Sequence, residues 1–145
     1  MNVAKADKDT LKINPKMCPF GRLTIISRKL GKLFKKHFKK LNVTQSQATI
    51  LLMLAEMGEI LQSDIGKHLE LERSTVSRDL VRLIDNGYLN KTASGVSPTI
   101  SLTKEGIKLA KLVTNEWGKG YKDSFQVLGN EGMNAVATIE QTMKR

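Results

Sequence analysis

Residues 59–103 read EILQSDIGKHLELERSTVSRDLVRLIDNGYLNKTASGVSPTISLT, and this stretch decides which fold the sequence predicts. Glycine just past a helix end supplies the left-handed conformation that closes the last turn, so we expect a helix to stop at Gly87. Periodicity and turn residues predict four elements here: a short helix at 63–69, a second helix starting at Glu72 or Leu71, and strands at 88–92 and 99–102. That order is typical of a helix-turn-helix followed by a hairpin wing.

The second helix of this stretch has two chemically different faces. At about 100° per residue, one side carries the apolar residues Val76, Leu80, Leu83 and Ile84, which we expect to be buried. The opposite side carries short hydroxyl groups and arginines, namely Ser74, Thr75, Arg78 and Arg82, with Ser77 on its flank. Arginine can bond two acceptors of guanine, and hydroxyl groups can bond bases or phosphates, so this face is predicted to read DNA. The alternative is an ordinary amphipathic helix with a solvated face.

The segments on either side of this helix add candidate contacts to the DNA backbone. Ser63 is predicted to cap the preceding helix through its hydroxyl, and Gln62 and Ser63 could hold a phosphate on backbone N–H groups. Gly66 would allow the two helices to approach closely. Lys91 is the cation nearest the wing tip (93–97), and we expect it to contact a phosphate. Because the wing tip has no arginine for a narrow minor groove, the wing should add little specificity.

At this point the sequence resembles a known family. The runs VTQSQATILLML (43–54), LERSTVSRDLVRLIDNGYL (71–89) and SLTKEGIKLA (101–110) resemble the multiple antibiotic resistance regulator (MarR) family of bacterial winged-helix repressors, over most of the chain. The resemblance implies a mainly α fold with a small β-hairpin, a winged helix-turn-helix and N- and C-terminal dimerisation helices. It implies a homodimer that binds pseudo-palindromic double-stranded DNA. A small molecule or an oxidant would release this homodimer from the DNA. Carried over by position, it implies DNA contacts from Ser74, Thr75, Ser77 and Arg78. Family members usually place Asp and Arg in the wing tip, and this chain has neither there.

A chain of 145 residues suits one domain. Residues 1–17 are polar and unpatterned and are predicted to form a flexible arm, while 18–145 form the regulator domain, with its DNA-binding core at about 44–102. Further helices are predicted within 18–41, at 45–57 with Thr44 as its cap, and within 104–145. The last segment is expected to hold two helices, one at 104–121 that Thr103 caps and whose end Gly118 and Gly120 weaken, and one at 131–143. Each terminal helix has an apolar stripe that so small a domain cannot cover alone. Two chains could bury these stripes together, and such a dimer presents two recognition helices about one DNA turn apart.

The net charge of +10 is concentrated near the N-terminus. No Asp or Glu occurs between Thr10 and Ala55, where ten Lys and Arg residues lie. Three interpretations stay open for this basic helix: a solvated face, contact with flanking DNA, or attachment to a membrane surface. No run of about 18 apolar residues and no signal-peptide core is present, so we expect no membrane-spanning segment and no membrane among the partners, and attachment to a membrane surface is the least favoured of the three interpretations. The single cysteine fits a reducing cytoplasm.

Cys18 admits two interpretations. It precedes Pro19 at a predicted helix start, where a thiol can become reactive, and its position resembles the sensing cysteine of the organic hydroperoxide regulators of this family. Those proteins carry tyrosines near the thiol, and the first helix here has none, so a small apolar role is favoured.

The sequence contains no metal-ligand cluster, phosphate-binding glycine loop or nucleophile–base pair, so we expect no enzyme activity, metal or cofactor. It predicts a sequence-specific DNA-binding transcriptional regulator. The alternative is an architectural DNA-binding protein with little sequence preference, and no effector-binding residue is identified.

Overall fold

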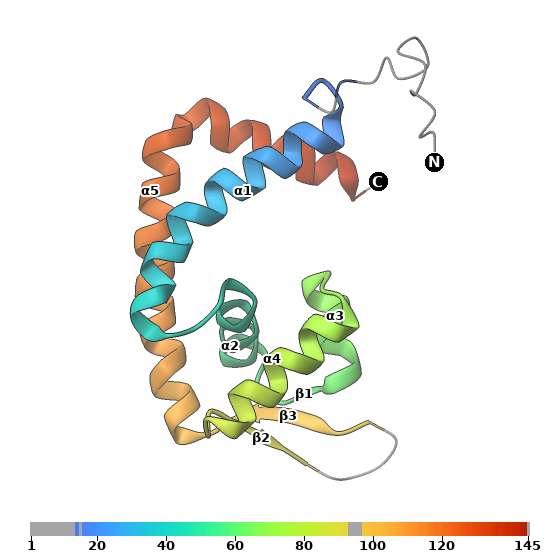
Figure 1. Cartoon of the computed structure of the whole chain (residues 1–145), viewed down its shortest axis with the longest axis vertical. Coiled ribbons are helices and arrows are strands. Elements are labelled where there is room, and N and C mark those ends of the chain that lie inside the picture. The colour runs from blue at the N-terminus through green and yellow to red at the C-terminus, as the bar shows by residue number, and fades with distance from the viewer. Residues whose placement is uncertain (1–13, 15, 93–96, 145) are drawn as a thin grey trace, which may run out of the picture. The chain divides into compact units, whose positions relative to one another are not determined.

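The computed structural model describes residue 14, residues 16–92 and residues 97–144. Most of the predicted N-terminal arm and residues 93–96 of the wing tip lie outside the described residues, so predictions about them stay predictions. The elements in chain order are α1 (Pro19–Phe38), η1 (Lys39–Leu41), α2 (Gln45–Met57), β1 (Ile60–Leu61), α3 (Gln62–Leu69), α4 (Arg73–Asp85), β2 (Leu89–Lys91), β3 (Thr99–Leu102) and α5 (Lys104–Met143) (Figure 1). The predicted fold class, mainly α with a small sheet in a winged-helix arrangement, is confirmed.

The chain divides into two compact units, Met1–Lys32 and Leu33–Arg145, with the boundary inside α1. In the first unit, α1 begins at Pro19, as predicted, and the Arg22 N–H donates to the Cys18 carbonyl at 2.9 Å. Phe20, at 79% exposure, Leu23 and Ile26 stand open to solvent there. None of the helices among the described residues is long and apolar enough to cross a membrane.

The core of the second unit packs α2 against the helix-turn-helix, the sheet and the first turns of α5. The buried apolar side chains include Ile50, Leu51, Leu54, Ile65, Val76, Leu80, Leu83, Ile100 and Val113. The α2 helix begins as predicted at Thr44, whose hydroxyl accepts the Gln47 N–H at 3.2 Å. The Gln47 side chain accepts the Thr44 N–H in return at 3.1 Å, so both free donors are satisfied.

The helix-turn-helix consists of α3 and α4. The predicted second helix begins at Arg73, one or two residues later than expected, and ends at Asp85 with Gly87 at φ +77°, the left-handed conformation predicted there. A methyl group on Gly66 would lie 3.1 Å from the Leu71 carbonyl oxygen and 3.6 Å from a Val76 methyl. The predicted close approach at Gly66 is therefore confirmed.

The start of α3 differs from the prediction. The helix begins at Gln62, and its N-cap is Leu61, whose aliphatic side chain cannot accept a hydrogen bond, so Ser63 is not the cap. The reason is a third strand that the sequence analysis missed: Ile60 pairs with Ile100 and Leu61 with Thr99, in an antiparallel sheet of order β1-β3-β2. Two residues are too few to show a strand pattern, and their partner lies about forty residues further along the chain.

The two predicted wing strands are confirmed, with β2 shorter than expected. Leu89 pairs with Leu102, Asn90 with Ser101 and Lys91 with Ile100. The Thr92 N–H donates to the Thr99 carbonyl at 3.0 Å, which continues the pairing toward the wing tip.

The two helices predicted at 104–121 and 131–143 are both present as the two parts of α5, but the first is longer than expected. Thr103 caps α5 as expected, because its hydroxyl accepts the Gly106 N–H at 3.0 Å. The first part continues past residue 121 to a kink at the non-helical residue Gly129, at φ +61° and ψ −174°, and the second part ends at Met143. The interruption therefore falls at Gly129, where the missing Cβ tolerates a positive φ, and Gly118 and Gly120 do not end the helix.

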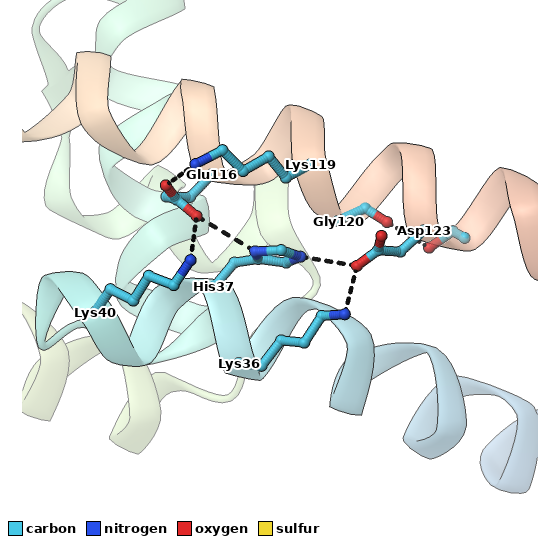
Figure 2. Close-up of polar contacts among 8 residues, drawn as sticks. Lys36, His37, Lys40, Glu116, Lys119, Gly120 and Asp123 are labelled. Atoms are coloured by element: carbon cyan, nitrogen blue, oxygen red, sulfur yellow. Dashed lines mark hydrogen bonds and ion pairs between the residues drawn. The ribbon is translucent and has the colours of Figure 1, made fainter.

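A charged cluster joins the end of α1 to α5 within the second unit. Figure 2 shows His37 between two carboxylates, with Nε2 2.8 Å from Asp123 Oδ2 and Nδ1 3.3 Å from Glu116 Oε2. Hydrogen bonds from Lys36 and then His37 hold the pKa of Asp123 below its usual value. The pKa of Glu116 is lowered chiefly by its hydrogen bond from Lys119. This cluster and the neighbouring aromatic rings of Phe34, Phe38 and Trp117 attach the end of α1 to α5.

Candidate nucleic-acid interface

A groove of about 860 Å³ runs between the start of α3, the first turns of α4 and the base of the wing. Four of the eight predicted DNA-contacting residues line it: Gln62, Ser63, Ser77 and Lys91. Its other lining residues are Gly66, Lys67, Leu71, Arg73, Val76, Ser97 and Pro98. The fold thus brings together residues from three elements that lie up to thirty-six positions apart in the chain.

Hydrogen bonds fix the wing base against the start of α3. The Gln62 N–H donates to the Pro98 carbonyl at 2.9 Å, and the Ser97 hydroxyl donates to the Ser63 hydroxyl at 3.2 Å. The Gln62 N–H is therefore engaged inside the protein, and the DNA contact predicted for Gln62 stays a prediction. The Ser63 side chain remains exposed at the groove.

Three cations distinguish the groove chemically. Lys67, Arg73 and Lys91 line it, whereas Asp and Glu do not occur among its described lining residues. Lys67 also contacts Asp64 at 3.2 Å, so its charge is partly compensated. Cations and hydroxyl groups around an open groove suit a phosphodiester, whose oxygens accept hydrogen bonds and carry negative charge.

The exposed side of α4 lies beside this groove, and we call it the recognition face. Of the predicted residues, Ser74, Ser77, Arg78 and Arg82 are exposed, and Thr75 is half-buried. The Arg78 side chain lies back along the helix, where Nε donates to the Ser74 carbonyl at 3.4 Å. The opposite side of α4 is anchored in the core by Val76, Leu80 and Leu83, as predicted. The recognition face is thus presented on a rigid helix.

Two groove residues, Lys67 and Arg73, were not among the predicted DNA contacts. Arg73 is the first residue of α4, and Lys67 lies one helical turn after Ser63. The helical spacing between Ser63 and Lys67 was a signal that could have identified Lys67. The position of Arg73 beside the wing depends on how α4 packs against β2, which the sequence alone does not show.

Other candidate sites offer less chemistry. Cys18 is free and half-buried. Trp117 packs against Phe34 and Phe38, with ring centroids 5.1 and 5.5 Å apart, whereas Tyr121 is exposed. Within residues 14, 16–92 and 97–144, no group of three or more His, Cys, Asp or Glu side chains is arranged to hold a metal ion.

Several known proteins are similar to this chain in sequence. A sequence model of the MarR family matches residues 41–96, which contain α2, α3, α4 and β2. The organic hydroperoxide resistance transcriptional regulator of Bacillus subtilis is 31% identical over 104 residues, which make up 70% of this chain and 69% of that protein. An uncharacterized HTH-type transcriptional regulator of Bacillus cereus is 26% identical over 85 residues, which are 59% of this chain, and the chain spans only 58% of that relative's length.

Solved structures show the same fold at lower identity. One of these structures is BpsR from Bordetella bronchiseptica, a protein whose DNA binding is regulated by 6-hydroxynicotinic acid. It has a TM-score of 0.82 at 17% identity, and the match covers 91% of this chain and 97% of that one. The S. aureus MepR–DNA complex has a TM-score of 0.74 at 21% identity, covering 88% of this chain and 96% of that one.

Proposed function

This chain belongs to the MarR family of transcriptional regulators, and on that premise we propose that it is a homodimeric protein that recognises specific sequences in double-stranded DNA. The proposed role is binding, with no catalytic step. Its proposed compartment is the cytoplasm, because a regulator of this kind must reach the chromosome.

One observation carries the proposal: a groove lined by cations lies directly beside an exposed helix face of hydroxyl groups and arginines. Lys67, Arg73 and Lys91 would hold the phosphate backbone and fix the register of the protein on the duplex. The recognition face, with Arg78 at its centre, would then meet base edges in the major groove, where arginine can bond O6 and N7 of guanine. A backbone contact and a base-reading face on one rigid core are what specific recognition requires.

The proposed dimer rests on apolar side chains near the chain termini. In the first unit, Phe20, Leu23 and Ile26 are exposed on α1. In the second unit, Val136, Ile139 and Met143, the last at 81% exposure, stand open on α5. We propose that 18–41 and 104–145 provide the dimerisation helices and about 44–102 the DNA-binding core. A two-fold dimer would bind a pseudo-palindrome, because its two recognition helices meet equivalent half-sites.

We propose that the protein acts as a repressor that a small molecule or an oxidant releases from DNA. Support comes from relatives only: BpsR is regulated by 6-hydroxynicotinic acid, and the Bacillus subtilis regulator is named for organic hydroperoxide resistance.

The alternative function is architectural DNA binding through charge alone. Its support is the absence of Asp and Glu between Thr10 and Ala55, a segment that carries ten cations. Non-specific binding is dominated by such charges and shows little preference among sequences.

Selection from random-sequence duplexes with the full-length protein separates the two functions. A specific regulator should enrich one pseudo-palindromic sequence and prefer it over random DNA by about 10³-fold or more at physiological salt. If repeated rounds enrich no sequence while binding stays strong and salt-sensitive, the protein is an architectural binder.

A further inference from the structure

Val81 is an apolar side chain in the middle of the recognition face. It is 54% exposed, whereas Val76, Leu80 and Leu83 on the same helix are buried. At about 100° per residue, Val81 lies within roughly 60° of Ser74, Ser77 and Arg78 around the helix axis. Its two methyl groups therefore stand among the side chains that are proposed to meet base edges.

Valine at this position is not part of the buried core. A β-branched residue loses rotamer freedom in a helix, and with more than half of its surface exposed Val81 offsets little of this loss by packing. Single exposed apolar residues are common on protein surfaces, so exposure alone is not an argument. The position of Val81 is informative, because polar groups surround it on a face that is proposed to enter the major groove.

The major groove presents one apolar group to a bound protein, the C5 methyl of thymine. We propose that Val81 contacts the C5 methyl of a thymine and thereby contributes to the base preference of the protein. This inference rests on the proposed function, since it concerns DNA already bound by the recognition face.

Helix geometry indicates where that thymine should lie. Val81 is three residues beyond Arg78, which corresponds to a rise of about 4.5 Å along α4. Successive bases of one strand are about 3.4 Å apart along the duplex. The thymine should therefore lie one or two base pairs from the base that Arg78 contacts, once in each half-site of a pseudo-palindrome.

Uracil provides a sharp test, because it differs from thymine only in lacking the C5 methyl. The probe is the duplex enriched from random sequences by the full-length protein. The two thymines at equivalent positions of the half-sites are replaced together by uracil, one position at a time. Binding of the wild-type protein and of Val81→Ala would be measured by fluorescence anisotropy on every duplex. Ile107→Ala is a matched control, because Ile107 is also exposed, at 46%, but lies on α5.

The expected result is a coupling between one methyl and one side chain. At one thymine position, uracil in both half-sites should weaken wild-type binding by roughly nine- to twenty-five-fold, because burying one methyl group is worth about three- to fivefold and the dimer loses two such contacts. Val81→Ala should weaken binding to the thymine duplex similarly and should bind the thymine and uracil duplexes equally well. Ile107→Ala should behave like the wild type on both.

Two results would overturn the inference alone. If uracil weakens the wild type and Val81→Ala by the same factor, another residue reads the methyl. If no thymine in the half-sites responds to uracil, no methyl is read at all. A selection that enriches no sequence overturns the proposed function together with this inference, whereas the first two results leave the proposed function standing. Circular dichroism of Val81→Ala confirms that the helix is intact.

Discussion

Replacing Arg73 and Lys91 together by Gln tests whether the groove holds the DNA backbone. Each phosphate contact contributes about 0.9 to the slope of log affinity against log salt concentration. A dimer carries two grooves, so the double variant removes four cations, and the slope should become shallower by up to about 3.6. We leave Lys67 in place, because its contact with Asp64 at 3.2 Å partly compensates its charge already. Base preference should not change, since backbone contacts carry no sequence information directly.

The assay is fluorescence anisotropy with the selected duplex and with random DNA at several salt concentrations. Lys108→Gln is the matched control, because Lys108 is exposed on α5 and pairs with Glu105 at 2.8 Å. The slope should fall equally on both DNAs for the double variant and stay constant for the control. An unchanged slope in the double variant would refute the assignment of the groove to phosphate binding.

The lysines at the end of α1 and in η1 can be tested for a second contribution to this slope with the same assay. Replacing Lys35, Lys36, Lys39 and Lys40 by Gln is expected to reduce the slope only if this helix faces flanking DNA. Lys36 and Lys40 already lie 2.7 and 3.9 Å from carboxylates on α5, so the effect should be smaller than four free lysines per protomer would give. A constant slope would mean that these lysines serve the charged cluster and solubility.

Arg78→Ala should cost about 1–3 kcal/mol on the selected duplex and flatten the preference at one base pair, and equal losses on random DNA would instead make Arg78 a backbone contact. Deleting residues 131–145 should give monomers or insoluble protein in sedimentation, and a folded full-length monomer at micromolar concentration would contradict the proposed dimer. Cys18→Ser should leave the response to mild hydroperoxide unchanged, and a release from DNA that the substitution abolishes would show that Cys18 senses oxidants. The lowered pKa of Asp123 means that its charged form stabilises the folded protein at pH values above the usual carboxyl range, and this contribution is lost as pH falls below about 4. The melting temperature of Asp123→Asn should therefore fall less steeply with decreasing pH than that of the wild type, and an identical fall would refute this.

The sequence by itself determined the helical elements and the two faces of α4. The buried positions of Val76, Leu80 and Leu83 and the exposed positions of Ser74, Arg78 and Arg82 follow from a 3.6-residue period, which is a local property. Caps are local too, so Thr44 and Thr103 could be identified from neighbouring residues alone. The order of these elements was enough to predict a winged helix.

Only the tertiary structure decided how the candidate interface is assembled. The strand β1 exists because Ile60 and Leu61 pair with β3, and that pairing occupies the Gln62 N–H and removes the cap expected at Ser63. Lys67, Arg73 and Lys91 become neighbours only when α3, α4 and the wing pack together, since no spacing along the chain encodes their proximity. Which of the glycines in the C-terminal segment interrupts α5 was likewise settled by backbone conformation, at Gly129. Long-range pairing and packing set these features, and a local pattern carries no information about them.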